Sequence, residues 1–259
     1  MLWVIDIGNT NIVSGVHDGE KWLHLWRIQT HRDKMPDEYA VLFRALLREV
    51  GLEPRQLDRA VISSVVPPLT GTLREVIERL CGFTPLIVGP HLDTGIKILL
   101  DNPLEIGSDL LANAVAGYQR MKGACIVVDF GTATSVIAVS ERGEFLGGAI
   151  APGLKLAVSA LAGGTAQLPA IPLAAPPRAI GTGTITAIQS GIVYGYIGLI
   201  EGLVQRFRAE MGCQAPVIAT GGLSGLMAEH TALFRQVDVG LTLEGIRLIA
   251  ERNRGADKG

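Results

Sequence analysis

Asp6-Ile7-Gly8-Asn9-Thr10-Asn11 is the stretch that decides the fold, because it joins one apolar run, residues 2–5, to another that begins at Ile12. The pattern Asp-x-Gly-x-x-[Asn/Thr] returns as Asp129-Phe130-Gly131-Thr132-Ala133-Thr134, after residues 124–128. Glycine permits a tight turn and a close backbone approach. Hydroxyl, amide and N–H groups can donate to phosphate oxygens, and carboxylates can hold the accompanying cation. Two ordinary Asp-Gly hairpin turns are the alternative, but the repeated setting favours a duplicated pair of phosphate-binding loops.

The composition is that of an ordinary globular protein. The chain has 259 residues, of which 48% are hydrophobic and 19% charged, and its net charge is −2. This length suits one large domain or two smaller ones, and the charge indicates neither a nucleic-acid partner nor an anionic membrane. We find no signal-peptide pattern, no uninterrupted apolar run of transmembrane length and no metal-ligand spacing of the three cysteines. We therefore expect a cytoplasmic protein that binds no membrane.

Hydrophobic periodicity predicts a similar order of elements in each half of the chain. The first half should contain strands at 2–7, 12–17 and 22–29, a helix at 36–50, a strand at 60–65, a helix ending at Gly82 and a strand at 86–88. The second should contain a helix reaching about residue 121, strands at 124–129, 135–139 and 145–150, helices at 152–162 and 186–211, a strand at 217–220, a helix beginning at 223–229 and a closing helix at 240–253. We therefore predict two related α/β lobes, residues 1–116 and 117–259, with a cleft between them.

The two loops, followed by Ala219-Thr220-Gly221-Gly222-Leu223, resemble those of the acetate and sugar kinase/Hsp70/actin superfamily. Within it the chain is similar to the type III pantothenate kinases over nearly its whole length. The other segments that carry the resemblance are Ser63-Ser64-Val65-Val66-Pro67, Asp101-Asn102-Pro103, Gly107-Ser108-Asp109 with Ala112-Asn113, Ala151-Pro152-Gly153, Gly181-x-x-Thr184 and Gln189-Ser190-Gly191. It implies an α/β fold of duplicated ribonuclease H-like (actin-like ATPase) lobes, each a mixed sheet flanked by helices, with an interlobe cleft. The P-loop and dinucleotide fingerprints are absent from the sequence.

The resemblance also implies a reaction, the ATP-dependent phosphorylation of pantothenate to 4′-phosphopantothenate, the first step of coenzyme A biosynthesis. It implies ATP with Mg²⁺ and a monovalent cation, K⁺ or NH₄⁺. Asp109 would be the general base, Asp129 would hold the monovalent cation, Asp6 would lie near Mg²⁺ and Thr132 would contact ATP. The segment implied to cradle the ATP phosphates is Asp6, Ile7, Gly8, Asn9, Thr10, Asn11, Ile12 and Val13. Pantothenate would be contacted by Gly107, Ser108, Asp109 and Leu110, and by Thr184 from the partner subunit of a homodimer.

Three positions depart from the family pattern, which usually has Tyr at Leu100, Arg at Leu110 and Lys at Thr182. Because pantothenate is an anion, the loss of a cation and a hydroxyl predicts weaker binding. One alternative is therefore a nucleotide-binding paralogue with an altered acceptor site, either a kinase for another small hydroxylated acceptor or a non-catalytic regulatory protein. A phosphate-ester or polyphosphate hydrolase is a further alternative. Taken alone, Asp109 would be a residue that caps a helix.

Overall fold

The computed structural model describes residues 1–165 and 168–255, which form two compact units. Unit 1 contains Met1–Ala116 and the segment that begins at Leu241, and unit 2 contains Gly117–Gly240. The closing helix, α7 (Leu241–Arg252), groups with unit 1 and not with the C-terminal lobe, because it packs against the first strands of the chain.

Unit 1 is built on a five-stranded mixed sheet in the order β3-β2-β1-β4-β5. Its first three strands form the predicted antiparallel meander, and β4 and β5 run parallel to β1. The strands are β1 (Leu2–Ile7), β2 (Asn11–His17), β3 (Trp22–Gln29), β4 (Arg59–Ser64) and β5 (Leu86–Ile87). The predicted strands of the first half are thereby confirmed.

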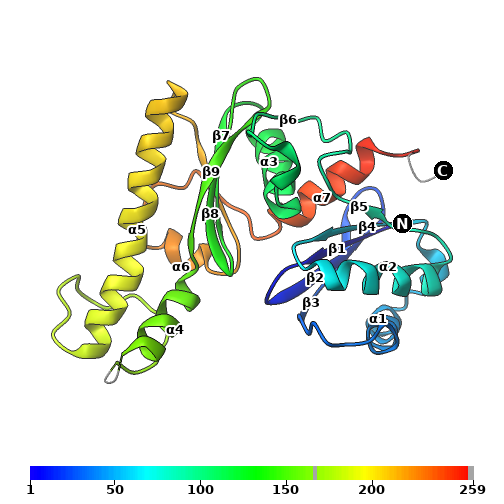
Figure 1. The fold of residues 1–259 in the computed structure, drawn as a ribbon, viewed down its shortest axis with the longest axis horizontal. Coiled ribbons are helices and arrows are strands. Elements are labelled where there is room, and N and C mark those ends of the chain that lie inside the picture. The colour runs from blue at the N-terminus through cyan, green and yellow to red at the C-terminus, as the bar shows by residue number, and fades with distance from the viewer. Residues whose placement is uncertain (166–167, 256–259) are drawn as a thin grey trace. The chain divides into compact units, whose positions relative to one another are not determined.

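Helices α1 (Pro36–Glu49) and α2 (Pro67–Cys81) pack against each other beside this sheet (Figure 1). Trp3, Ile5 and Ile7 of β1 belong to the core that these helices cover, and the Trp3 ring meets Phe43 of α1 edge-on at 5.1 Å. Since successive side chains of a strand point to opposite faces, Asp6 lies on the other face of the sheet.

Unit 2 repeats this sheet with the order β11-β10-β7-β8-β9. Here too three antiparallel strands come first, and the later strands add in parallel beside the first of them. The strands are β7 (Cys125–Phe130), β8 (Ala133–Val139), β9 (Glu144–Pro152), β10 (Val217–Thr220) and β11 (Gln236–Val237). The duplication predicted from the two acidic-glycine loops is therefore present in the strand topology.

Helices α4 (Leu154–Gly164) and α5 (Thr184–Met211) lie on one side of the second sheet (Figure 1). Helix α4 begins two residues later than predicted, because Pro152 still pairs with Ala133 at the end of β9. The remaining elements are α3 (Ser108–Met121), α6 (Ser224–Ala228), the two-residue strand β6 (Lys97–Ile98) and the short turns Pro54–Gln56 and Pro103–Glu105. Sequence periodicity did not predict β6, β11 or these turns, since two or three residues carry no period.

Helix α5 is long and apolar enough to cross a membrane by length and composition, the one such helix in the part of the chain that the structure describes. Core helices of soluble proteins meet the same criterion, and a third of the most apolar stretch of α5 is buried within the structure. Ile192, Val193, Ile197, Ile200 and Val204 form the buried side of α5.

The three cysteines are free thiols in different surroundings. Burial raises the pKa of Cys81 to about 11 and that of Cys125 to about 12, whereas Cys213 is exposed. The partly buried Cys81 and the buried Cys125 are therefore protonated at neutral pH and pack as small apolar residues.

Candidate functional site

The first acidic-glycine loop is a tight turn held by the end of β3. The Gly8 N–H donates to the Asn11 carbonyl at 3.0 Å, closing the turn. Thr30 then holds it from outside, because its N–H donates to the Thr10 carbonyl at 2.9 Å and its hydroxyl donates to the Gly8 carbonyl at 2.7 Å. Sequence reasoning missed Thr30, which lies outside any motif and is brought to the loop by the β2–β3 pairing.

The Asp6 carboxylate is hydrogen-bonded within a cluster that contains the buried hydroxyl groups of Ser63 and Ser108. The parallel pairing of β1 with β4 sets Asp6 opposite Ser63, and the Ser63 hydroxyl donates to Asp6 Oδ1 at 2.9 Å. Ser63 Oγ also lies 3.0 Å from Ser108 Oγ, at the first residue of α3. The Ser108 hydroxyl accepts from the Ser64 N–H at 3.0 Å and donates to the Ser64 carbonyl at 3.1 Å. The structure thus joins Asp6 to the start of α3 through residues far apart in the sequence.

Asp109 follows Ser108 in the first turn of α3. Its Oδ1 accepts a hydrogen bond from the Leu110 N–H at 2.8 Å, and a Cβ at Gly107 would come within 2.7 Å of that oxygen. Burial raises the pKa of Asp109, and the backbone N–H bonds to its carboxylate oppose the shift without cancelling it. A carboxylate with a raised pKa is a stronger base. The predicted residues Gly107, Ser108, Asp109 and Leu110 form one turn in unit 1.

The second acidic-glycine loop is a tight turn at the corresponding place in unit 2, and it is one residue shorter than the first, since Phe130 pairs with Thr134 whereas Ile7 pairs with Ile12. The Gly131 N–H donates to the Ala133 carbonyl at 3.1 Å, and the Gly153 N–H donates to the Thr132 carbonyl at 3.1 Å. Gly221 follows β10 with φ +87°, and a Cβ there would lie 2.4 Å from Asp129 Oδ1. The Asp129 carboxylate therefore rests against the backbone of the Gly221 turn, where only glycine leaves room for it.

Thr220 adds a second oxygen beside Asp129. The register of β10 and β7 sets Thr220 opposite Asp129, so the two side chains share a face of the sheet. Thr220 is fully buried and its hydroxyl has no hydrogen-bond partner, which is a costly state for a polar group. No group of three or more His, Cys, Asp or Glu within the described residues could hold a metal. A carboxylate beside a neutral hydroxyl oxygen offers the oxygen ligands that hard cations take in proteins.

Leu100, Leu110 and Thr184, the other positions of the predicted acceptor site, lie apart in the chain and differ in exposure. Leu100 and Leu110 of unit 1 are half-buried. Thr184 is the exposed first residue of α5 in unit 2. The predicted contact of Thr184 with the partner's pantothenate stays a prediction.

A cavity of about 590 Å³ opens beside the first loop, and its lining includes the positively charged side chain of Arg32, which sequence reasoning missed. It is lined by Asn9, Thr30, Arg32 and Lys34, among others, and the Arg32 guanidinium donates to Asn9 Oδ1 at 2.7 Å. An Asn9 side chain that accepts through Oδ1 is left with its NH₂ group as a donor. No sequence signal identified Arg32, since one arginine after a strand is ordinary.

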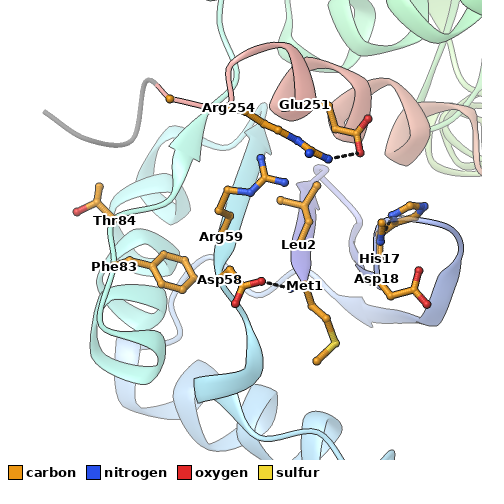
Figure 2. Close-up of a pocket in the computed structure, with 12 residues that line it drawn as sticks. Met1, Leu2, His17, Asp18, Asp58, Arg59, Phe83, Thr84, Glu251 and Arg254 are labelled. Carbon is orange, nitrogen blue, oxygen red and sulfur yellow. Dashed lines mark hydrogen bonds and ion pairs between the residues drawn. The ribbon is translucent and has the colours of Figure 1, made fainter.

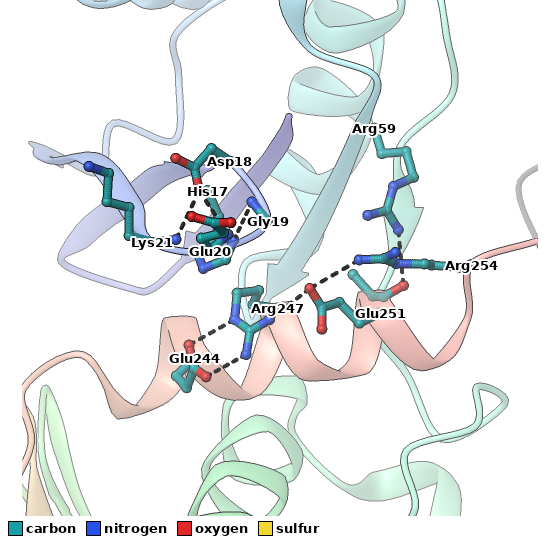
Figure 3. Close-up of polar contacts among 11 residues, drawn as sticks. His17, Asp18, Gly19, Glu20, Lys21, Arg59, Glu244, Arg247, Glu251 and Arg254 are labelled. Carbon is teal, nitrogen blue, oxygen red and sulfur yellow. Dashed lines mark hydrogen bonds and ion pairs between the residues drawn. The ribbon is translucent and has the colours of Figure 1, made fainter.

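A larger cavity, of about 680 Å³, lies at the opposite edge of the first sheet (Figure 2). Its lining comes from the amino-terminal ends of β1 and β4, represented by Leu2 and Arg59, from the β2–β3 turn and from the end of the chain near Arg254. No predicted site residue lines it. Figure 3 shows the polar contacts beside it, in which Arg247 of α7 is held by Glu244 and Glu251 at 2.6 and 2.7 Å.

Comparison with known proteins identifies the family. The family model for type III pantothenate kinase matches residues 2–206. The chain belongs to the type III pantothenate kinase family. The type III pantothenate kinases of Geotalea uraniireducens and Moorella thermoacetica are each 47% identical to it over 98% of this chain, covering 99% and 100% of those proteins.

A solved structure supports the fold independently. MreB 5 of Spiroplasma citri, bound to AMPPNP, matches with a TM-score of 0.56 at 8% identity, covering 98% of this chain and 97% of that one. At that identity the likeness concerns the fold alone. The predicted actin-like class, with two mixed sheets flanked by helices, is confirmed.

Proposed function

We propose that this protein phosphorylates the primary hydroxyl of pantothenate at the expense of ATP, forming 4′-phosphopantothenate in the cytoplasm. The observation that carries the proposal is 47% identity to type III pantothenate kinases over 98% of the chain. The cluster of Asp6, Ser63 and Ser108 beside Asp109 agrees with it. Full-length identity at this level favours a pantothenate kinase over the paralogue with another acceptor, the regulatory protein or the hydrolase.

Phosphoryl transfer needs a positioned acceptor, a neutralised triphosphate and a group that takes the hydroxyl proton. Residues 6–13 cradle the ATP phosphates through the N–H groups and side chains of the turn, and Thr132 of the second loop contacts ATP. Mg²⁺ bound with ATP would neutralise phosphate charge, and Asp6 would hold it. Asp109 accepts the proton of the acceptor hydroxyl, a role that its raised pKa favours.

Asp129 and Thr220 hold the monovalent cation, K⁺ or NH₄⁺. The support is the carboxylate packed against Gly221 and the buried Thr220 hydroxyl without a partner. Thr220→Val tests this assignment, because valine keeps the volume and removes the oxygen. We expect the variant to be at least as thermally stable as wild type without K⁺, and to need several-fold more K⁺ for half-maximal thermal stabilisation. An unchanged K⁺ requirement would exclude Thr220 as a ligand.

Pantothenate binds at the first turn of α3, against Gly107, Ser108 and Leu110. Leu110 lacks the cation expected there, so Leu110→Arg should lower the KM for pantothenate about 10-fold, as expected for one hydrogen bond to a charge. Leu110→Met is the control, since it keeps the size and stays uncharged. An arginine variant with the KM of the methionine variant would show that the binding site does not lack a cation at this position.

We assign α5 as the interface of a homodimer, through which Thr184 reaches the partner's pantothenate. Gly191, Gly195 and Gly198 have open space where a Cβ would lie, and Leu199 beside them is 37% exposed. Small residues at such spacing let two helices approach closely. Gly195→Glu should yield a monomer in light scattering with little kinase activity, and a variant that remains a dimer would refute the interface.

The deciding experiment is ATP-dependent phosphorylation of pantothenate by the purified protein with Mg²⁺, with and without K⁺. We expect 4′-phosphopantothenate to form and K⁺ to accelerate it. ATP binding without product at millimolar pantothenate would overturn the proposed function.

A further inference from the structure

We propose that Ser63 and Ser108 are positioning residues, which form a hydroxyl relay that ties Asp6 to the helix turn carrying Asp109. The proposal rests on the proposed kinase function, and it assigns a role to two buried hydroxyl groups that would not touch the reacting atoms, so that Ser108 contacts pantothenate only through its backbone. The relay joins three elements of unit 1, namely the end of β1, the end of β4 and the start of α3.

The relay is buried and made of short contacts. Ser63 is 0% exposed and Ser108 is 7% exposed. The distances along it are 2.9 Å from Asp6 Oδ1 to Ser63 Oγ and 3.0 Å from Ser63 Oγ to Ser108 Oγ. Hydrogen bonds that end on a charge and lie away from water are stronger than exposed neutral ones. The relay therefore restricts the Asp6 carboxylate more than a surface contact would.

The chemistry of the groups fixes the donor at the Asp6 end of the relay. An ionised carboxylate can only accept, so the single hydroxyl hydrogen of Ser63 points to Asp6. The single hydroxyl hydrogen of Ser108 has two acceptors within reach, Ser63 Oγ at 3.0 Å and the Ser64 carbonyl at 3.1 Å, while the Ser108 oxygen accepts from the Ser64 N–H at 3.0 Å. The contacts therefore run without a break from the backbone of β4 through Ser108 and Ser63 to Asp6, and adjacent hydrogen bonds of this kind polarise one another.

The partners of Ser108 set it apart from a residue that only caps a helix. A serine at the start of a helix typically accepts from N–H groups of its own first turn. The hydroxyl of Ser108 bonds instead to Ser63 and to the backbone of Ser64, both of them in β4. The next residue is Asp109, so any loosening of this attachment moves the base relative to Asp6. Displacements of about 1 Å can cost about 100-fold in rate when reacting groups must align.

The test is a double-mutant cycle with Ser63→Ala, Ser108→Ala and the double variant. Thr70→Val is the matched control, because the Thr70 hydroxyl bonds to Ser64 Oγ at 2.8 Å but has no contact with the relay to Asp6. We would measure kcat and KM for pantothenate, the dissociation constant of Mg·ATP without pantothenate, and the melting temperature of each variant.

We expect each serine variant to lose about 10- to 100-fold in kcat with a KM for pantothenate within about 3-fold of wild type. The double variant should be no slower than the worse single variant, since breaking either link uncouples Asp6 from α3. Mg·ATP binding should weaken in both serine variants, while Thr70→Val should keep wild-type kcat and Mg·ATP binding.

Wild-type kcat in Ser108→Ala, or losses that multiply in the double variant, would overturn the relay. A loss of kcat equal to that of Thr70→Val would show that the two serines contribute only ordinary packing. If the wild-type protein does not phosphorylate pantothenate, the proposed function fails, and the relay is then tested by the Mg·ATP dissociation constants of the variants alone. Equal, non-additive weakening in the two serine variants supports the relay, and unchanged affinity refutes it.

Discussion

Gly245 allows α7 to contact α3, and Gly245→Ala should destabilise unit 1. A Cβ at this buried position would lie 1.9 Å from the Ala112 carbonyl oxygen and 2.5 Å from its carbonyl carbon. Real Cβ contacts essentially never fall below 3.0 Å, so the two helices must separate by about 1.1 Å. The obstacle is backbone, so no side-chain rotamer can relieve it. Overpacking of this kind costs about 3 kcal/mol at the upper end of the usual range.

The helix preference for alanine over glycine offsets about 1 kcal/mol of this cost. The net loss of about 2 kcal/mol should lower the melting temperature by about 4–8 °C for a protein of this size. We would measure thermal unfolding by circular dichroism. Because α3 also carries Asp109, kcat should fall at temperatures where the variant is still folded.

Gly71→Ala is the matched control within unit 1. Gly71 lies in α2, is exposed and has no atom within 4 Å of the position of a Cβ. Only the helix preference applies there, so this variant should melt up to about 4 °C above wild type. A Gly245→Ala protein that is as stable as Gly71→Ala would refute the close helix contact on which the reasoning rests.

Four further predictions concern Asp109, Gly221 and the cysteines. Asp109→Asn should reduce kcat by about 100-fold or more, and it should raise the melting temperature at neutral pH. The pKa of Asp109 is higher in the folded protein than in the unfolded chain, so the wild-type protein loses stability as pH rises through the folded-state pKa. Asparagine does not ionise, so the variant avoids this loss. Wild-type kcat should fall as pH drops through the raised pKa of Asp109, because the protonated carboxyl group cannot act as a base. The midpoint of this fall should lie above the usual pKa of aspartate, and a midpoint at or below that pKa would contradict the role of Asp109 as the base. Gly221→Ala should abolish K⁺-dependent thermal stabilisation, because its Cβ would displace the Asp129 carboxylate. A thiol reagent should modify Cys213 rapidly, the partly buried Cys81 more slowly and the buried Cys125 only when the protein unfolds, and three equally fast thiols would contradict these differences in exposure.

Most long elements were predictable because helices show a clear apolar period and strands are short apolar runs bounded by turn residues. The meander of unit 1 and its copy in unit 2 follow from such runs broken by glycine turns, and β1, β7 and β8 are buried on both faces with no alternation. Helix ends were less predictable. Pro152 ends a strand by pairing with Ala133, a partner distant in the sequence. The grouping of α7 with unit 1 likewise depends on contacts with β1 that no local pattern encodes.

The candidate site divides in the same way. Asp6 and Asp129 could be identified from the sequence because each belongs to a loop whose glycine and polar residues are adjacent. The pairs Thr30 with Gly8 and Thr220 with Asp129 could not, since their members are 22 and 91 residues apart. Such contacts arise from strand register, which depends on the whole sheet.

By itself the sequence determined the family, the duplicated α/β topology and the chemical type of the two loops, because these depend on residue identity and local spacing. Only the tertiary structure decided that Ser63 would bind Asp6, that Ser108 would join β4 to α3, and that Gly245 would let α7 meet Ala112. Those arrangements require distances of a few tenths of an ångström between distant segments. Close packing and buried hydrogen bonds set such distances only once the whole unit has folded.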